Sequence, residues 1–257
     1  MNQRERREYL INKLLAEQPQ YSELEMPVEA EEQKRLLRSL MNVRRPQPVS
    51  GEIVRVQDEY LQTETCAKGI TEFSGLTPVE EGIYLWKGDI TTLHCDAIVN
   101  AANSGMTGCY YPCHRCIDNA IHTYAGMQLR LECAQLMKRQ GHEEPVGRAK
   151  ITGAYNLPSN YIIHTVGPIV GEKVTPEDER LLEACYRSCL GLAESNNIKS
   201  IAFCCISTGE FHFPNERAAE IAVKTVRDYI KREDSQIEVI FNVFKEIDYD
   251  IYRKLLG

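Results

Sequence analysis

The chain has 257 residues, of which 43% are hydrophobic and 26% charged, and its formal net charge is −7. This composition is typical of a globular protein, and the acidic balance argues against binding to duplex nucleic acid, which normally needs a basic face. The sequence has no apolar run long enough for a membrane helix and no signal-peptide h-region, so we expect a cytoplasmic protein that does not cross a membrane. An anionic small ligand remains compatible with the charge, because backbone N–H groups bind phosphate without Lys or Arg.

Residues 1–75 are predicted to form a helical extension in which both signs of charge are mixed. Apolar residues at helical spacing predict helices at about 1–17, 29–42 and 51–66, and prolines and polar residues separate them. The apolar content of this region is too low to predict independent folding. We therefore expect the extension to pack on the rest of the chain.

Residues 76–257 show a different pattern, in which predicted strands alternate with predicted helices. Several strands are continuous apolar runs, as expected for strands that are covered on both faces. The alternation predicts a three-layer α/β/α domain. The predicted strands are 82–88, 96–103, 149–155, 161–167, 200–207 and 238–244, and the predicted helices are 118–139, 177–196, 214–232 and 247–256.

Ten cysteines are many for a chain without an export signal, and we expect no disulfide framework. Most of them are expected to be small core residues. Cys204 and Cys205 lie in an apolar run, and Cys185 and Cys189 share one face of a helix. The cysteines between residues 109 and 116 are different, because they cluster tightly in a polar segment.

Neither of the two commonest nucleotide-binding fingerprints, GxxxxGK[ST] and GxGxxG, is present. Instead, polar motifs follow three predicted strands: GDIT at 88–91, VNAANS at 99–104 and STGEFHFP at 207–214. Ligands of open α/β sheets bind outside the carboxyl ends of the strands, and a Ser-Thr-Gly loop before a helix offers N–H donors to a diphosphate. Each motif alone also has a structural explanation, since Asp89 can cap a turn and Asn103 can satisfy loop backbone.

The order and spacing of GDIT, DAIVNAAN, DNAIHTYAG, YIIHTVGP and STGEFHFP resemble the macrodomain family, which binds ADP-ribose. The resemblance covers about residues 80–257 and implies a mixed central sheet. It implies that Asp89 accepts the adenine amine, that the Ile90 N–H faces the ring, and that Asn103 bonds the distal ribose. Further ADP-ribose contacts implied by the resemblance come from Ser207, Thr208, Gly209 and Glu210 around the diphosphate, Phe211 against the distal ribose, and Asn242 or Phe244 beside adenine.

The segment GMTGCYYPCHRCIDNAIH replaces the glycine-rich loop of the commoner hydrolytic macrodomains. Cysteine and histidine side chains this close together are typical zinc ligands. Cys113 and His114 are adjacent, so their side chains diverge in extended backbone, and three ligands with an open fourth position are favoured over a closed structural site. The zinc-containing macrodomains carry C-x4-H-x-C here, which Cys109, His114 and Cys116 match.

Two other interpretations of this segment lack support in the surrounding sequence. The CxxC formed by Cys113 and Cys116 lacks a thioredoxin-like context, and PCHRC lacks the H-x-E half of the nucleobase-deaminase signature. A structural zinc that only shapes the loop stays open.

Asp118 aligns with an aspartate of the zinc-free hydrolytic class, and we assign it with Asn103 to the catalytic set. The alternative role for Asp118 is N-capping of the following helix. His122 is expected to hydrogen-bond in the core, His164 to be a satisfied core histidine, and His212 to help close the ribose pocket or to have no role.

The resemblance therefore predicts a zinc-dependent hydrolase that removes mono-ADP-ribose from protein side chains. It also implies functional pairing with a sirtuin-like ADP-ribosyltransferase and with a lipoylated carrier protein. Two alternatives stay open: a non-catalytic ADP-ribose-binding module with structural zinc, and an O-acetyl-ADP-ribose deacetylase.

Overall fold

The computed structural model describes residues 1–21 and 23–257. Its strands are β1 (Thr71–Glu72), β2 (Pro78–Glu80), β3 (Ile83–Lys87), β4 (Leu93–His94), β5 (Ala97–Ala102), β6 (Ala149–Gly153), β7 (Tyr161–Val166), β8 (Ser200–Phe203) and β9 (Glu238–Val243). Its α-helices are α1 (Gln3–Glu17), α2 (Ala30–Val43), α3 (Gly51–Lys68), α4 (Ile117–Ala125), α5 (Met127–Gln140), α6 (Pro176–Ser195), α7 (Asn215–Glu233) and α8 (Glu246–Leu256). None of the helices in the described ranges is both long and apolar enough to cross a bilayer.

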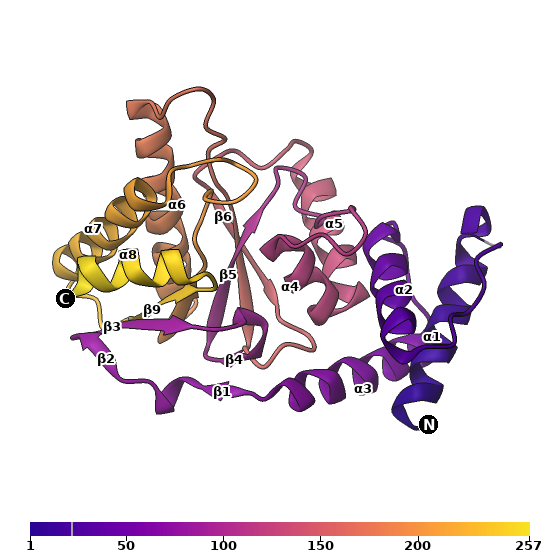
Figure 1. Cartoon of the computed structure of the whole chain (residues 1–257). Coiled ribbons are helices and arrows are strands. Elements are labelled where there is room, and N and C mark those ends of the chain that lie inside the picture. The colour runs from indigo at the N-terminus through magenta and orange to yellow at the C-terminus, as the bar shows by residue number, and fades with distance from the viewer. Residues whose placement is uncertain (22) are drawn as a thin grey trace.

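A seven-stranded mixed sheet in the order β2-β3-β9-β8-β5-β7-β6 forms the centre of the molecule (Figure 1). The five inner strands are parallel, and the edge strands β2 and β6 are antiparallel to their neighbours. Helices α4 and α5 pack beside β5 and β6, whereas α6, α7 and α8 pack together as another layer. The predicted three-layer α/β/α fold with a mixed central sheet is confirmed.

The inner strands are nearly continuous apolar runs, which explains why they occupy the middle of the sheet. Four of the six residues of β5 are fully apolar and buried, and all four residues of β8 are buried. Cys185 and Cys189 of α6 are buried against this core, as the sequence predicted, and all ten cysteines are free. Burial of apolar side chains on both faces is the main stabilisation of a parallel sheet.

The predicted helix 118–139 is wrong, because α4 ends at Ala125 and α5 begins at Met127. Gly126 between them has φ 101° and ψ 177°, a conformation that is essentially restricted to glycine. The break lets the α3 side chain of Gln57 accept a hydrogen bond from the Met127 N–H at 2.8 Å. The sequence also gave no indication of the short strands β1, β2 and β4.

The three N-terminal helices share a buried apolar cluster that also includes Met127 of α5. The extension therefore has a hydrophobic cluster of its own, which its low apolar content did not lead us to expect. Helix α2 lies beside α4, and α3 contacts α4 and the turn after β3. The boundary at residue 75 stays a prediction. The buried apolar residues of the helices are Leu10, Ile11, Leu14, Leu37, Leu40, Met41, Ile53, Val56, Tyr60 and Leu61.

We predict that Gly126→Ala lowers the free energy of unfolding by about 1–3 kcal/mol, because the backbone conformation at this position is strained for any side chain. An added Cβ would also lie 2.6 Å from the Gln57 amide nitrogen. Urea unfolding measures the change. Gly153→Ala in β6 is the matched control, since an added Cβ meets nothing within 4 Å there. An equal free energy of unfolding in the two variants would contradict the strain argument.

Candidate functional site

The first part of the site lies at the carboxyl end of β3, where Asp89 begins a 3₁₀ turn over Ile90–Thr92. One carboxylate oxygen of Asp89 accepts the N–H of Thr91 at 3.0 Å and its hydroxyl at 2.6 Å. The other oxygen lies 3.1 Å from the Lys68 ammonium. Burial raises the pKa of Asp89, but the Thr91 hydrogen bonds and the Lys68 charge outweigh it, so the pKa lies below its usual value. Asp89 is therefore an ionised acceptor that also caps its turn.

Lys68 is the last residue of α3 and brings the N-terminal extension to this end of the site. Its ammonium lies 3.4 Å from the centroid of the Tyr124 ring. The side chain of Asn242 donates to the carbonyl of Gly88 at 3.0 Å and so holds the turn that carries Asp89. Phe244 is 76% exposed. The predicted adenine contact of Asn242 stays a prediction.

The second part of the site is the loop after β8, which joins Ser207 to the buried Phe213. Ser207 and His212 have φ values of 65° and 57°, so the loop turns sharply at both ends. The N–H of Phe213 donates to the carbonyl of Ser207 at 3.0 Å and closes the loop. Gly167 permits this packing, because a Cβ there would lie 2.0 Å from the Ser207 hydroxyl.

The middle of this loop presents its backbone outward. Gly209 and Glu210 are exposed and Thr208 and Phe211 are half-buried. In the part of the chain that the structure describes, the N–H groups of these four residues donate to no other group. Clustered free N–H groups just before a helix are suited to an anion such as a diphosphate.

The third part of the site is a buried polar network at the carboxyl end of β5. The amide of Asn100 donates to one oxygen of Asp118 at 2.8 Å, and the amide of Asn103 lies 3.4 Å from the other oxygen. Asn103 also donates to the carbonyl of Gly108 at 3.3 Å. Burial raises the pKa of Asp118 to about 6, although the Asn100 hydrogen bond lowers it.

Asp118 does not cap α4, so the N-capping alternative is wrong. The N-cap residue is Cys116, whose sulfur accepts the N–H of Asn119. Asp118 lies in the first helical turn with its side chain turned toward β5. The favourable end of the helix dipole therefore faces a carboxylate that bonds to the two asparagines.

His122 and His164 lie behind this network and are both buried. His164 contacts the Thr152 hydroxyl at 2.9 Å and the Asn100 amide at 3.1 Å, so the predicted satisfied core histidine is confirmed. His122 is in the core as predicted, but within the described residues neither of its ring nitrogens has a hydrogen-bond partner. The sulfur of Cys133 lies 3.9 Å from His164 and within 4.8 Å of a ring nitrogen of His122.

The fourth part of the site is the group Cys109, His114 and Cys116, whose ligand atoms all lie within 4.8 Å of one another. The Cys109 sulfur is 3.7 Å from Nδ1 of His114. Tetrahedral zinc, with bonds of about 2.3 Å to sulfur and about 2.0–2.1 Å to nitrogen, places such atoms about 3.6 Å apart, so these residues fit zinc. Burial raises the pKa of the Cys116 thiol to about 12, and the nearby Cys109 thiol contributes to the increase. A divalent cation would reverse that effect.

Cys113 points away from this group. Its sulfur lies 3.3 Å from the Ser39 hydroxyl of α2, and its φ is 53°. Nε2 of His114 lies 3.5 Å from a carboxylate oxygen of Glu210. The cysteine–histidine group therefore adjoins the loop after β8.

The Macro domain model matches residues 99–222. A relative from Treponema medium named protein-ADP-ribose hydrolase is 56% identical over the full length of both chains. The chain belongs to the macrodomain family. A Staphylococcus aureus relative of the same name is 49% identical over 97% of this chain and 94% of its own length.

Two further similar proteins have names that mention a second activity and a bound ligand of their own. A Fusarium oxysporum protein named "probable bifunctional ADP-ribose hydrolase/ADP-ribosyltransferase" is 42% identical over 86% of this chain and 40% of its own length. The Trypanosoma brucei macrodomain in complex with ADP-ribose has a TM-score of 0.67 and 30% identity, and the match covers 85% of this chain and 95% of that one.

The sequence analysis missed several residues that contact the site but are far from it along the chain. Arg38 of α2 donates to the carbonyl of His114, Arg130 of α5 donates to the carbonyl of Cys109, and Lys68 reaches Asp89. No local pattern marks these side chains, since arginine and lysine are ordinary on a helix surface. Asn100 was visible in the VNAAN motif, but its bond to Asp118 depends on the fold.

We predict that Asp118→Asn stabilises the metal-free protein at neutral pH. The pKa of Asp118 in the folded wild type is about 6, which is above its value in the unfolded chain. Between about pH 4 and pH 6 the unfolded chain therefore loses this proton more readily than the folded protein, and the free energy of unfolding falls as the pH rises. Asp118→Asn has no carboxyl group at this position, so its free energy of unfolding does not fall for this reason. Its advantage therefore grows across that window and stays constant above it, at up to about 3 kcal/mol.

Urea unfolding of both proteins at pH 5 and pH 7.5 measures this difference. The exposed Asp250→Asn on α8 is the control for loss of one negative charge. A stability difference at Asp118 that does not change with pH would contradict the burial argument.

Proposed function

We propose that the chain is a zinc-dependent hydrolase that removes mono-ADP-ribose from modified protein side chains. The observation that carries the proposal is the grouping of Cys109, His114 and Cys116 within 4.8 Å, against Glu210 and close to the Asn103–Asp118 pair. The full-length relatives named protein-ADP-ribose hydrolase support the activity. The donor set supports zinc, because two thiols and an imidazole are ligands that zinc prefers.

Binding energy comes from contacts that are remote from the reacting bond. Asp89 accepts the adenine amine, the free N–H groups from Thr208 to Phe211 bind the diphosphate, and Phe211 lies against the distal ribose. These contacts hold the anomeric carbon of the distal ribose beside Asn103. Fixing the reacting carbon in this way removes much of the entropic cost of the reaction.

Asn103 and Asp118 act at the distal ribose. Asn103 orients a ribose hydroxyl, and Asp118 holds the Asn103 amide and, in its ionised form, can accept a proton from water. A zinc ion bound by the three ligands would supply Lewis acidity toward an oxygen of the substrate or a water molecule. The bond that breaks joins the anomeric carbon to the side-chain oxygen of the modified protein.

The substrate protein and its transferase are part of the proposal. We expect the mark to be written by a sirtuin-like ADP-ribosyltransferase and to be placed on a lipoylated carrier protein. The Fusarium oxysporum relative supports the pairing with a transferase, since its name combines both activities in one chain. The location of such a pair in the cytoplasm is also part of this proposal.

We predict that Asp89→Ala weakens binding of ADP-ribose and of AMP by ten- to a hundredfold. Both ligands carry the adenine amine, and losing a charge-assisted hydrogen bond costs about 1.5–3 kcal/mol. Calorimetry measures both affinities. Unchanged affinities, or equal affinity of the wild type for AMP and ADP-ribose, would contradict the assigned cleft.

We predict that the wild type, purified without added zinc, contains about one equivalent of zinc per chain, and that His114→Ala and Cys116→Ala lose it. ADP-ribose affinity should fall less than about tenfold in these variants, whereas single-turnover release from an ADP-ribosylated protein should fall at least about a hundredfold. This split is expected because the adenine and diphosphate contacts lie elsewhere. Cys113→Ser is the matched control and should keep its zinc.

The same measurements separate the alternatives. A binding module with structural zinc would show no turnover in the wild type and would lose affinity together with the metal. A deacetylase would release acetate from O-acetyl-ADP-ribose and would leave the modified protein unchanged.

A further inference from the structure

The segment that carries the three candidate ligands, residues 103–116, contains no helix or strand in the described chain. It joins β5 to α4, and its internal backbone bonds link Met106 to Asn103 and His114 to Tyr111. A metal site needs ligands held to within about 0.5 Å, which a loop of this length does not achieve alone. Its geometry must therefore come from neighbouring elements.

Arg38 of α2 makes the first contact between the N-terminal extension and this loop. Its guanidinium donates to the carbonyl of His114 at 3.0 Å and to the side-chain oxygen of Asn119 at 2.8 and 3.2 Å. The buried Asn119 in turn donates from its side chain to the carbonyl of Tyr111 at 3.0 Å. The N–H of Asn119 also bonds to the sulfur of Cys116. One arginine thus fixes the backbone on both sides of the ligand His114.

Asn42, one turn further along α2, makes the second contact. Its side-chain oxygen accepts the N–H of Cys113 at 2.9 Å, and its amide donates to Thr123 of α4 at 2.9 Å. Cys113 has a φ of 53°, which is costly for a cysteine and needs support from its surroundings. Asn42 supplies that support and also directs the Cys113 side chain toward α2, away from the ligands.

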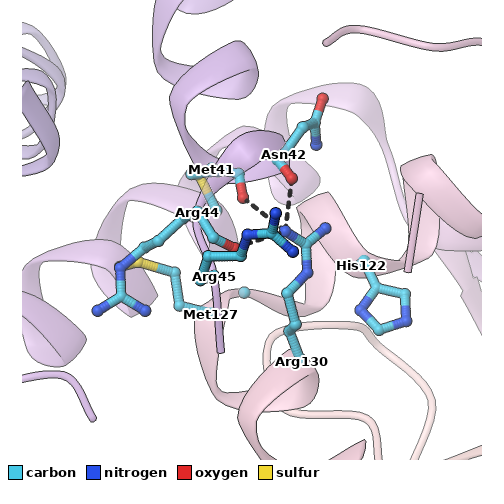
Figure 2. A pocket seen from close by; sticks show the side chains of 8 residues that line it. Met41, Asn42, Arg44, Arg45, His122, Met127 and Arg130 are labelled. Atoms are coloured by element: carbon cyan, nitrogen blue, oxygen red, sulfur yellow. Dashed lines mark hydrogen bonds between the residues drawn. The ribbon is translucent and has the colours of Figure 1, made fainter. Parts of the chain in front are cut away.

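Arg130 of α5 makes the third contact, at the end of α2. It donates to the backbone carbonyls of Met41, Asn42 and Arg44, which have no partners within the helix (Figure 2). The same guanidinium donates to the carbonyl of Cys109 at 3.2 Å. The end of α2 and the first ligand residue are therefore joined through one buried cation.

We infer that α2 of the N-terminal extension is a positioning element of the metal site, and that Arg38 and Asn42 are its positioning residues. The inference rests on the proposed function for the identity of the metal, but the contacts themselves do not depend on it. Groups that orient metal ligands from outside typically contribute 10- to 100-fold in metal affinity. The extension is then a working part of the hydrolase.

The test uses full-length Arg38→Ala, with Arg6→Ala as the matched control. Arg6 bonds to Glu59 inside the extension and does not contact the loop. Zinc affinity is measured by competition with a chromophoric chelator, and melting temperature is measured for each variant. We expect Arg38→Ala to weaken zinc binding about 10- to 100-fold, Arg38→Lys to recover part of it, and Arg6→Ala to retain wild-type affinity.

Hydrogen exchange of residues 109–116 in the metal-free proteins gives a second readout that needs no zinc. We expect faster exchange at His114 in Arg38→Ala only, because its N–H bonds to the Tyr111 carbonyl that Arg38 holds through Asn119. Equal zinc affinity and equal exchange in the two arginine variants would overturn the inference. If the wild type binds no zinc, the proposed function fails, and the exchange data alone decide whether α2 positions the loop.

Discussion

The buried carboxylate of Asp118 joins β5, the loop that follows it and α4, which together carry the candidate catalytic residues. Asp118 is 5% exposed, and its oxygens face the amides of Asn100 and Asn103. Removing a carboxylate from water costs free energy, which the amides and the first turn of α4 offset only in part. The raised pKa of Asp118 reflects the part of this cost that is not offset. The Asn103 amide that faces Asp118 also bonds to the carbonyl of Gly108. Asp118 is therefore linked, through Asn103, to the start of the loop that carries Cys109, His114 and Cys116.

The N-terminal extension contacts the candidate site at two places. Helix α2 bonds to the loop of Cys109, His114 and Cys116 through Arg38 and Asn42, and α3 places Lys68 beside Asp89. Lys68 contributes to the depressed pKa of Asp89, so a residue outside the α/β core helps to keep this carboxylate, the proposed adenine acceptor, ionised. The glycine break at Gly126 seats α3 against the start of α5. The extension is therefore joined to the candidate site through several independent contacts.

The fold was predictable from sequence because burial leaves a strong local signal. The apolar runs of β5, β7 and β8 marked the inner strands, and Pro176 marked the start of α6. The division of one predicted helix at Gly126 was not predictable, because the apolar pattern continues across the glycine. The break allows the N–H of Met127 to bond to Gln57, which is 70 residues distant along the chain.

The candidate site was predictable only where its residues follow strands or cluster in sequence. Asp89, Asn103 and Ser207 follow β3, β5 and β8, and their proximity is a consequence of the parallel sheet. Arg38, Lys68 and Arg130 act across separations of 21 to 81 residues. Such contacts depend on tertiary packing, which no single-sequence pattern reports.

The chain contains two groups with the chemistry of a metal site, and burial separates their roles. Cys133, His122 and His164 lie in the core, where burial raises the pKa of the thiol and lowers the pKa of both imidazoles, that of His164 to about 3. All three are therefore neutral, and they fill the space behind the Asn100–Asp118 pair. The group of Cys109, His114 and Cys116 is half-buried and adjoins the loop that carries Glu210. The zinc ion proposed for this group would be able to exchange a ligand with substrate or water, which a closed core site does not permit. Thiols and imidazoles thus serve packing in the core group, whereas those of the half-buried group are accessible to the proposed metal.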